Sequence, residues 1–315
     1  MHRPSLLSYS VVGECARCMK IKAREHATGY LFVTPLLVLF AIFLFYGFYF
    51  IIQTSFFKET LSFRDAEFVG WENYRMVIED SRFLYSIVNN LVFSAAAIVI
   101  GVSVGCLVSV VLSIGIRGSK FLGALFFIPS FMPLALIAMV FSIMLEYRFG
   151  TLNQLLHGIG LDFLAQRWLS NPEMAYLSVI SISVFLIGLP MMYYNADMTT
   201  INSGILEAAV IDGAGLGRMM WNILFPLLKN AHKTIILSTL LGSFREFERI
   251  FLLTQGGPAG ATENTSVYIY SFVRSAGANI GFVCAASAIV LLIALSISVV
   301  QMLAFRTKAR KGGRG

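Results

Sequence analysis

Charged side chains are scarce in this sequence. Only 13% of the 315 residues are Asp, Glu, Lys or Arg, and 57% are apolar, whereas soluble domains contain about 25% charged and about 45 to 50% apolar residues. Such a composition cannot supply a water-soluble surface. The chain is therefore predicted to lie in a lipid bilayer.

The sequence also lacks a GxxxxGK[ST] phosphate loop, so it has no visible means of holding ATP phosphates. Its four histidines are scattered, with no HExxH or nucleophile motif near them: His2, His26, His157 and His232. We expect no enzyme activity, no metal and no cofactor in this chain. Any nucleotide energy has to come from a partner.

Cysteine is equally sparse. Cys15 and Cys18 form a lone CxxC, without the second ligand pair or the βαβ context that a zinc or redox role requires, and Cys106 and Cys284 fall within apolar stretches. The sequence gives no positive signal for a cysteine function.

Long uncharged stretches are what the sequence does contain. Crossing a hydrocarbon core takes about 20 apolar helical residues, and five stretches reach that length: 27–57, 83–116, 121–145, 174–196 and 275–305. They are continuous rather than alternating, which indicates helices and not barrel strands. A sixth candidate, 234–253, is weaker because it contains four charged residues, and the alternative for it is a buried soluble helix.

We count that segment as spanning, because five helices would put the two basic tails on opposite sides of the membrane. The fold prediction is all-α, a polytopic membrane protein with six transmembrane helices. Lys and Arg are concentrated in both tails and in the segments around Arg117 and Arg218, so the positive-inside rule places both termini in the cytoplasm. The expected parts are a basic tail at 1–29, a transmembrane domain at 30–305 and a second basic tail at 306–315.

The basic residues flank helices and form no patch with interleaved aromatic residues, which argues against nucleic-acid binding. The first outer segment contains Gly70 followed by an amphipathic pattern, with Trp71 and Tyr74 suited to contact lipid headgroups. In the second outer segment, Gly150 is predicted to end one helix and 170–172 to begin the next.

The cytoplasmic segment 197–233 is too long for a simple connector. Local rules predict a helix through Ile211, a glycine-rich turn at 212–217, and a second helix that stops ahead of Pro226. An ordinary surface hairpin would satisfy the spacing alone.

The residues in this segment resemble a known motif. Glu207-Ala208-Ala209, Gly213 four positions later, and then Ile223 and Pro226 are similar to the EAA loop of binding-protein-dependent ABC importer permeases, with Phe225 where Leu is usual. Three further segments, 68–75, 150–156 and 253–258, are similar to the branch that imports maltose, glycerol 3-phosphate and other carbohydrates. Gln255 stands where that branch often has Gly.

The resemblance implies an EAA-type coupling helix between the fourth and fifth transmembrane helices, docked on an ATPase dimer that binds ATP and Mg. The residues implied for ATPase coupling are Glu207, Ala208, Ala209, Asp212, Gly213, Gly217, Met220 and Pro226. Met219, Met220 and Trp221 are expected either to supply an apolar docking surface or to pack within the permease.

It also implies a second homologous permease subunit, membrane lipid around the helices, and a periplasmic or lipid-anchored solute-binding protein that contacts Gly256, Gly257 and Pro258. The location it implies is the bacterial cytoplasmic (inner) membrane.

The charged stretch of the fifth helix matches the part that lines the translocation path in the carbohydrate branch. A charge at the bilayer centre costs about 2.5 to 3.5 kcal/mol, so these side chains should face protein or a wet cavity. We expect Arg245 and Arg249 to share one helical face and contact an acidic substrate such as alginate or a sugar phosphate, with Glu248 within reach of Arg245. An internal Arg–Glu network that only fixes packing is the alternative.

Tyr193, Tyr194 and Asn195 are expected to border the same path, where the aromatic rings can stack on sugars. The main alternative to an ATP-driven importer is an ion-coupled secondary transporter, which predicts internal repeats that the sequence does not clearly show. A membrane-embedded enzyme or a passive channel is a further alternative.

Overall fold

The computed structural model describes residues 7–60, 66–113, 116–275 and 277–312, and it describes side chains within 30–303 of those ranges. Cys15 and Cys18 therefore lie outside the described side chains. The chain forms two compact units, Met1–Thr54 and Ser55–Gly315. The first contains nearly all of α1 (Leu7–Ser55), so helix begins within the predicted basic tail.

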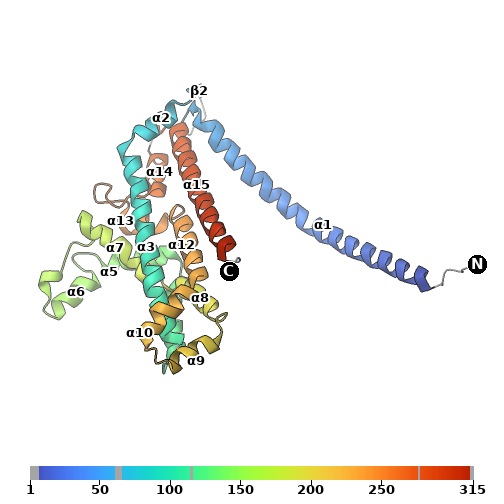
Figure 1. Cartoon of the computed structure of the whole chain (residues 1–315). Coiled ribbons are helices and arrows are strands. Elements are labelled where there is room, and N and C mark those ends of the chain that lie inside the picture. Colours follow the sequence, from blue (N-terminus) through green and yellow to red (C-terminus); the bar gives the residue numbers. More distant parts are fainter. Residues whose placement is uncertain (1–6, 61–65, 114–115, 276, 313–315) are drawn as a thin grey trace, which may run out of the picture. The chain divides into compact units, whose positions relative to one another are not determined.

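The second unit is almost entirely helical (Figure 1). Its first elements along the chain are β1 (Phe57–Lys58), β2 (Glu67–Phe68), α2 (Glu72–Glu79), α3 (Ser81–Ser113), α4 (Ser119–Phe131), α5 (Leu134–Met144), α6 (Thr151–Gly158), η1 (Asp162–Leu164) and α7 (Pro172–Phe185). It continues with α8 (Gly188–Met198), α9 (Ser203–Ile211), α10 (Leu216–Arg218), the π-helical turn η2 (Met219–Leu224), α11 (Phe225–Leu227), α12 (Lys229–Ser243), α13 (Glu248–Thr254), α14 (Thr265–Val273) and α15 (Ile280–Gly312).

Within the described part of the chain, four helical spans are long and apolar enough to cross a membrane: Tyr30–Ser55, Ser81–Ser113, Pro172–Met198 and Ile280–Leu303. The pair α4 and α5 makes a fifth if it is counted as one span. These five correspond to the five uncharged stretches in the sequence. The predicted sixth, 234–253, is not among them.

The third stretch differs from the continuous helix expected of it. α4 and α5 meet at an angle of 99°, and Met132 between them is extended, with φ −79° and ψ 144°. Pro133 explains the break, because proline lacks an N–H and disfavours the helical conformation of the residue before it.

The fifth predicted helix is also broken. α12 ends at Ser243 and α13 starts at Glu248, so the expectation that Arg245 and Arg249 share one helical face is wrong. The carbonyls at the break find partners elsewhere: Asn264 Nδ2 donates to Glu246 O, and Ser266 Oγ donates to Phe244 O at 3.2 Å. Backbone carbonyls that leave a helix require such partners where water does not reach them.

The segment between α8 and α12 contains the predicted helix and glycine turn. α9 ends at Ile211, and Gly213, two residues later, is in the left-handed region at φ 75°. Two hydrogen bonds close the turn: Gly213 N donates to Val210 O at 3.0 Å, and Ala214 N donates to Ala209 O at 2.9 Å. This is a Schellman cap, in which glycine avoids a steric penalty.

The second helix of this segment was predicted to end ahead of Pro226. That prediction is wrong, because the chain stays helical through η2 and α11. Proline cannot donate an i→i−4 bond, and the wider π-helical turn immediately before it absorbs that mismatch. The outcome is one nearly continuous run from Leu216 to Ser243, interrupted at Leu228.

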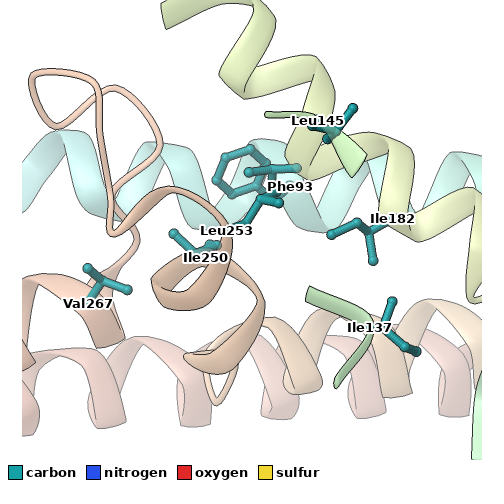
Figure 2. Close-up of a cluster of buried hydrophobic side chains, with 8 residues drawn as sticks. Phe93, Ile137, Leu145, Ile182, Ile250, Leu253 and Val267 are labelled. Carbon is teal, nitrogen blue, oxygen red and sulfur yellow. The ribbon is translucent and has the colours of Figure 1, made fainter. Parts of the chain in front are cut away.

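The core of the second unit lies between its long helices. α3 packs against α7, α8 and α12, while α13 packs against α5. Figure 2 shows one of three buried apolar clusters, in which Phe93, Ile182 and Ile250 from α3, α7 and α13 meet. In Figure 1, α9 and α10 lie at one end of this unit and α2 at the other.

The structure confirms the glycine turn and the amphipathic helix predicted within 68–75. Gly70 has φ 59°, and α2 follows. Asn73 on α2 is fully buried and donates to the carbonyls of Ser55 and Phe57, both at 2.9 Å. Gly281 of α15 sits against this pair of bonds: a Cβ there would lie 1.7 Å from Phe57 O.

Candidate functional site

A cavity of about 620 Å³ lies among α3, α4, α5, α7, α8 and α12 and contains the charged stretch. This volume is typical of small-molecule sites. Apolar groups form most of its wall, and its polar lining includes Ser94, Ser130, Ser183, Thr239, Arg245, Glu246, Glu248 and Arg249. Ser130 Oγ has no hydrogen-bond partner within the described part of the chain.

Arg249 is held tightly in the cavity wall. Its side chain is 4% exposed and its Nε lies 2.6 Å from Glu246 Oε1. Nη2 donates to Glu246 Oε2 at 2.6 Å, and Nη1 donates to Ser183 Oγ at 2.7 Å. Nε approaches the carboxylate without making a hydrogen bond, so the contact with Glu246 is an ion pair with one charge-assisted hydrogen bond, from Nη2. Through Glu246 and Ser183, Arg249 joins the α12–α13 break to α7.

Arg245 and Glu248 are different. Both are exposed, both line the cavity, and neither forms an ion pair with another described residue. The two arginines therefore have different surroundings. Arg249 belongs to an internal Arg–Glu network, with Glu246 as its partner, and Arg245 is open to the cavity.

The three candidate residues on α8 lie elsewhere. Tyr194 is fully buried, and its hydroxyl lies 2.6 Å from His232 Nδ1, so its ring cannot stack on a sugar in this conformation. Asn195 lines a different pocket beside Lys120, and Tyr193 packs against a buried cluster around Tyr194. None of the three lines the cavity at Arg245.

The residues predicted to couple this chain to an ATPase begin on α9 and continue through the turn after it into α10. Glu207, Ala208, Asp212 and Gly217 are exposed, and Ala209 is buried. Beside them a groove of about 600 Å³ is lined by residues that include Ala208, Ala209, Asp212 and Arg218. Large apolar side chains surround the turn, and Ile211 is 85% exposed. An exposed apolar surface of this kind indicates an interaction site.

Met219, Met220 and Trp221 were expected either to form an apolar docking surface or to pack within the permease, and the three residues differ in this respect. Met219 and Met220 pack against the permease's own buried cluster, whereas Trp221 is 59% exposed and Pro226 is exposed. Only Trp221 of the three presents a large apolar side chain at the surface.

Gly256, Gly257 and Pro258 belong to an outer loop at 255–264 that lines a polar pocket of about 720 Å³ with Arg82 and Tyr85. Gln255 has φ 53°, a left-handed conformation that glycine adopts without strain, which gives a physical reason why Gly is common at this position. Asn89 Nδ2 donates to Ala261 O at 2.9 Å and to Glu263 O at 2.8 Å, so α3 holds the loop in place.

A second outer segment, 146–170, is organised by one buried side chain. Asn153 is 2% exposed. It donates to the carbonyls of Tyr147 and Gln166 at 3.1 and 3.0 Å and accepts from Trp168 Nε1 at 2.7 Å. Nearby, the hydrogen bond from His157 lowers the pKa of the Asp162 carboxyl.

Asn89, Asn153 and Asn264 were not identified from the sequence, although each supports a candidate region. A signal existed for Asn89, because it interrupts an uncharged apolar stretch, where a polar side chain requires a buried partner. In the described residues, no group of His, Cys, Asp and Glu side chains is placed to hold a metal ion.

Several proteins are similar to this chain over most of its length. The probable ABC transporter permease protein YurN of Bacillus subtilis is 32% identical over 88% of this chain and 96% of the relative. The trehalose/maltose transport system permease protein MalF of Thermococcus litoralis is 27% identical over 91% and 97%. The sn-glycerol-3-phosphate transport system permease protein UgpA of Agrobacterium fabrum is 28% identical over 86% and 92%.

Two solved structures have the same fold. One is described as a bacterial ABC transporter involved in the import of the acidic polysaccharide alginate; it has a TM-score of 0.77 at 23% identity and covers 92% of this chain and 99% of its own. The other is a bacterial alginate ABC transporter in complex with an alginate pentasaccharide-bound periplasmic protein, with a TM-score of 0.75 at 23% identity over 89% and 94%.

The sequence profile of the family described as "Binding-protein-dependent transport system inner membrane component" matches residues 97–309, which include the EAA segment, the loop at 255–264 and the cavity residues other than Phe93 and Ser94. The chain belongs to this family of binding-protein-dependent transport system inner membrane components.

Proposed function

We propose that this chain is the permease subunit of an ATP-driven ABC importer and forms half of a translocation pathway for a carbohydrate. The observation that carries the proposal is the EAA segment, an exposed helix and glycine turn with an adjacent groove, in a chain of this family. Sugar and sugar-phosphate transport by the relatives named above supports the substrate class. Family membership favours this function over an ion-coupled secondary transporter.

In the proposed mechanism the chain lies in the bacterial inner membrane with both termini in the cytoplasm, and the broken segment α12–α13 provides its sixth crossing. A partner ATPase dimer binds ATP and Mg and docks at α9. Glu207 pairs with a basic residue of the ATPase, Ala208 and Ala209 permit close approach, and Gly213 supplies the turn. Movement of that dimer is then transmitted to the helices as rigid bodies.

The cavity at Arg245 is the proposed pathway. Because Arg249 is neutralised by Glu246, Arg245 is the cation left to meet an acidic group on the sugar, and Glu248 and the serines are left to bind hydroxyls. A second, similar permease completes the wall. A solute-binding protein delivers the sugar at Gly256, Gly257 and Pro258.

The test is Glu207→Lys, which reverses the charge at the docking surface. We expect the ATPase to be lost when the complex is purified through this chain, because the variant places like charges opposite each other, and uptake to fall with it. Asp162→Lys, at an exposed outer position, is the matched control and should change neither. An intact ATPase stoichiometry together with normal uptake in Glu207→Lys would refute the proposed coupling site.

A further inference from the structure

Of the two histidines whose side chains the structure describes, His157 and His232, the second lies between helices, and its ring makes two hydrogen bonds to different elements. Nε2 lies 2.9 Å from Phe225 O. A carbonyl only accepts, so Nε2 carries the proton, and in the neutral ring Nδ1 is then an acceptor. The Tyr194 hydroxyl, 2.6 Å from Nδ1, is then the donor to it, and its other contact, with Val102 O of α3, is longer at 3.3 Å. Every hydrogen-bonding atom of the ring is thus committed.

These bonds join the end of the EAA segment to the helix bundle. Phe225 follows the π-helical turn η2, and its ring lies 4.4 Å from the His232 ring between centroids. On the surface side, Phe225 contacts the exposed Trp221 ring at 5.3 Å. On the interior side, Tyr194 is fully buried on α8. A continuous line of contacts therefore runs from Trp221 to α8.

The same line reaches the cavity wall. Tyr194 lies against Gly105 of α3, where an added Cβ would be 3.7 Å from its ring and 2.9 Å from Pro190. Gly101 lies one turn before Gly105 on α3, and an added Cβ there would be 3.1 Å from Pro190. Gly101 and Pro190 both line the cavity at Arg245. Helices that touch through glycine and proline have no flexible side chains to absorb a shift.

A second bond reinforces the junction. Asp197 Oδ2 at the end of α8 accepts from Ala231 N on α12 at 3.1 Å. The first turn of α12 is therefore tied to α8 at two neighbouring residues, Ala231 through its backbone and His232 through its ring. Movement of η2 and α11 is then transmitted to α8 instead of being lost by bending at Leu228.

We propose that His232 is the positioning residue that connects the EAA segment to the α3–α8 wall of the cavity, so that ATP hydrolysis by the docked partner is converted into transport. This inference rests on the proposed function. It assigns a role to a side chain that contacts neither the ATPase surface nor the cavity.

The experiment uses the whole complex in proteoliposomes and measures two quantities, ATP hydrolysed and sugar taken up. His232→Phe keeps a ring of similar size and removes both hydrogen bonds. We expect the ATPase to remain bound and its hydrolysis to change by less than about twofold, while uptake falls about tenfold, because the buried ring loses both of the hydrogen bonds that connect it to Phe225 and Tyr194. The ATP used per sugar rises accordingly.

Tyr194→Phe removes only the hydroxyl from a ring that stays buried, and it provides the same readout if His232→Phe fails to assemble. The double variant should be no worse than the more defective single variant, because both changes break one connection. His157→Phe, at an exposed position outside this junction, is the control and should leave the ATP used per sugar unchanged.

The inference is overturned if Tyr194→Phe and an assembled His232→Phe keep the normal ratio of ATP to sugar, or if their effects on it add. Loss of the ATPase from either variant would also overturn it, since the role would then be in docking. A different result would refute the proposed coupling site at Glu207. In that case Glu207→Lys would keep the ATPase bound and transport sugar at the normal rate.

Discussion

Single residues decide the shape of this molecule at its outer end. Gly281 is the clearest case, because α15 passes so close to the β1 strand that a methyl group has no room. The contact it permits is between backbone and the buried Asn73 amide, which bridges Ser55, Phe57 and, through Asn279 Nδ2 at 2.9 Å, the start of α15.

Gly281→Ala should therefore destabilise the protein by about 1 to 3 kcal/mol, since the new Cβ displaces Phe57 O and breaks its bond to Asn73. Thermal unfolding of the detergent-solubilised protein measures the effect. Gly158→Ala, where a Cβ meets nothing within 4 Å, is the control and should change stability by less than about 0.5 kcal/mol. Equal effects from the two variants would contradict the packing argument.

Elements show where sequence reasoning succeeds and where it ends. Hydropathy identified the spans α3, α7–α8 and α15 because an uncharged stretch of that length has few alternatives, and Gly70 and Gly213 lie at helix ends as predicted. Gly150 does not end a helix, because α5 already ends at Met144; it is the residue that precedes α6. The bend at Pro133 and the break at Phe244–Phe247 were missed for a physical reason. A proline weakens a helix without fixing an angle, and the second break depends on Asn264 and Ser266, which are distant in sequence.

The candidate site was also predicted only in part from the sequence. The charged stretch was found because charge is costly in a bilayer, yet spacing alone suggested a pairing of Arg245 with Glu248. Because the helix is broken between Ser243 and Glu248, Arg245 and Glu248 do not pair, and Arg249 pairs with Glu246, three residues before it. The hydrogen bond between Tyr194 and His232 joins two different helices, and no local pattern predicts it.

Asn153 offers a test at the level of one element. Asn153→Ala should loosen the segment 146–170, because it leaves two carbonyls and the Trp168 N–H without their partner, at a cost of about 1 to 3 kcal/mol. Limited proteolysis from the outer side, followed by mass spectrometry, reads out cleavage in this segment. Gln154→Ala, which removes one exposed bond of 3.3 Å, is the comparison. Identical cleavage of both variants would show that α6 is held by other contacts.

At the scale of the whole molecule, the second unit places its two candidate surfaces at different depths: the EAA segment at one end and the charged cavity within the bundle. Communication between them has to pass through α3, α8 and α12, which pack on one another. The family match covers α8, α12 and the part of α3 from residue 97 onward.

Charge recognition can be tested on the assembled transporter. Arg245→Gln should reduce uptake of acidic oligosaccharides about tenfold and uptake of neutral ones by less than about twofold, since a lost charge-assisted bond is worth about 1.5 to 3 kcal/mol and a hydroxyl still finds the amide. Arg249→Gln should reduce both alike, because it disrupts the wall through Glu246 and Ser183. Equal losses of acidic and neutral sugars in Arg245→Gln would exclude charge recognition at this position.

The ion pair between Arg249 and Glu246 has an electrical consequence. An elementary charge that crosses the bilayer gains or loses about 2.3 kcal/mol for every 100 mV of membrane potential. Opposite charges 2.6 Å apart that travel together experience opposing work, which nearly cancels. Movement of this ion pair is therefore close to electroneutral, and the membrane potential of an energised cell neither drives it nor opposes it.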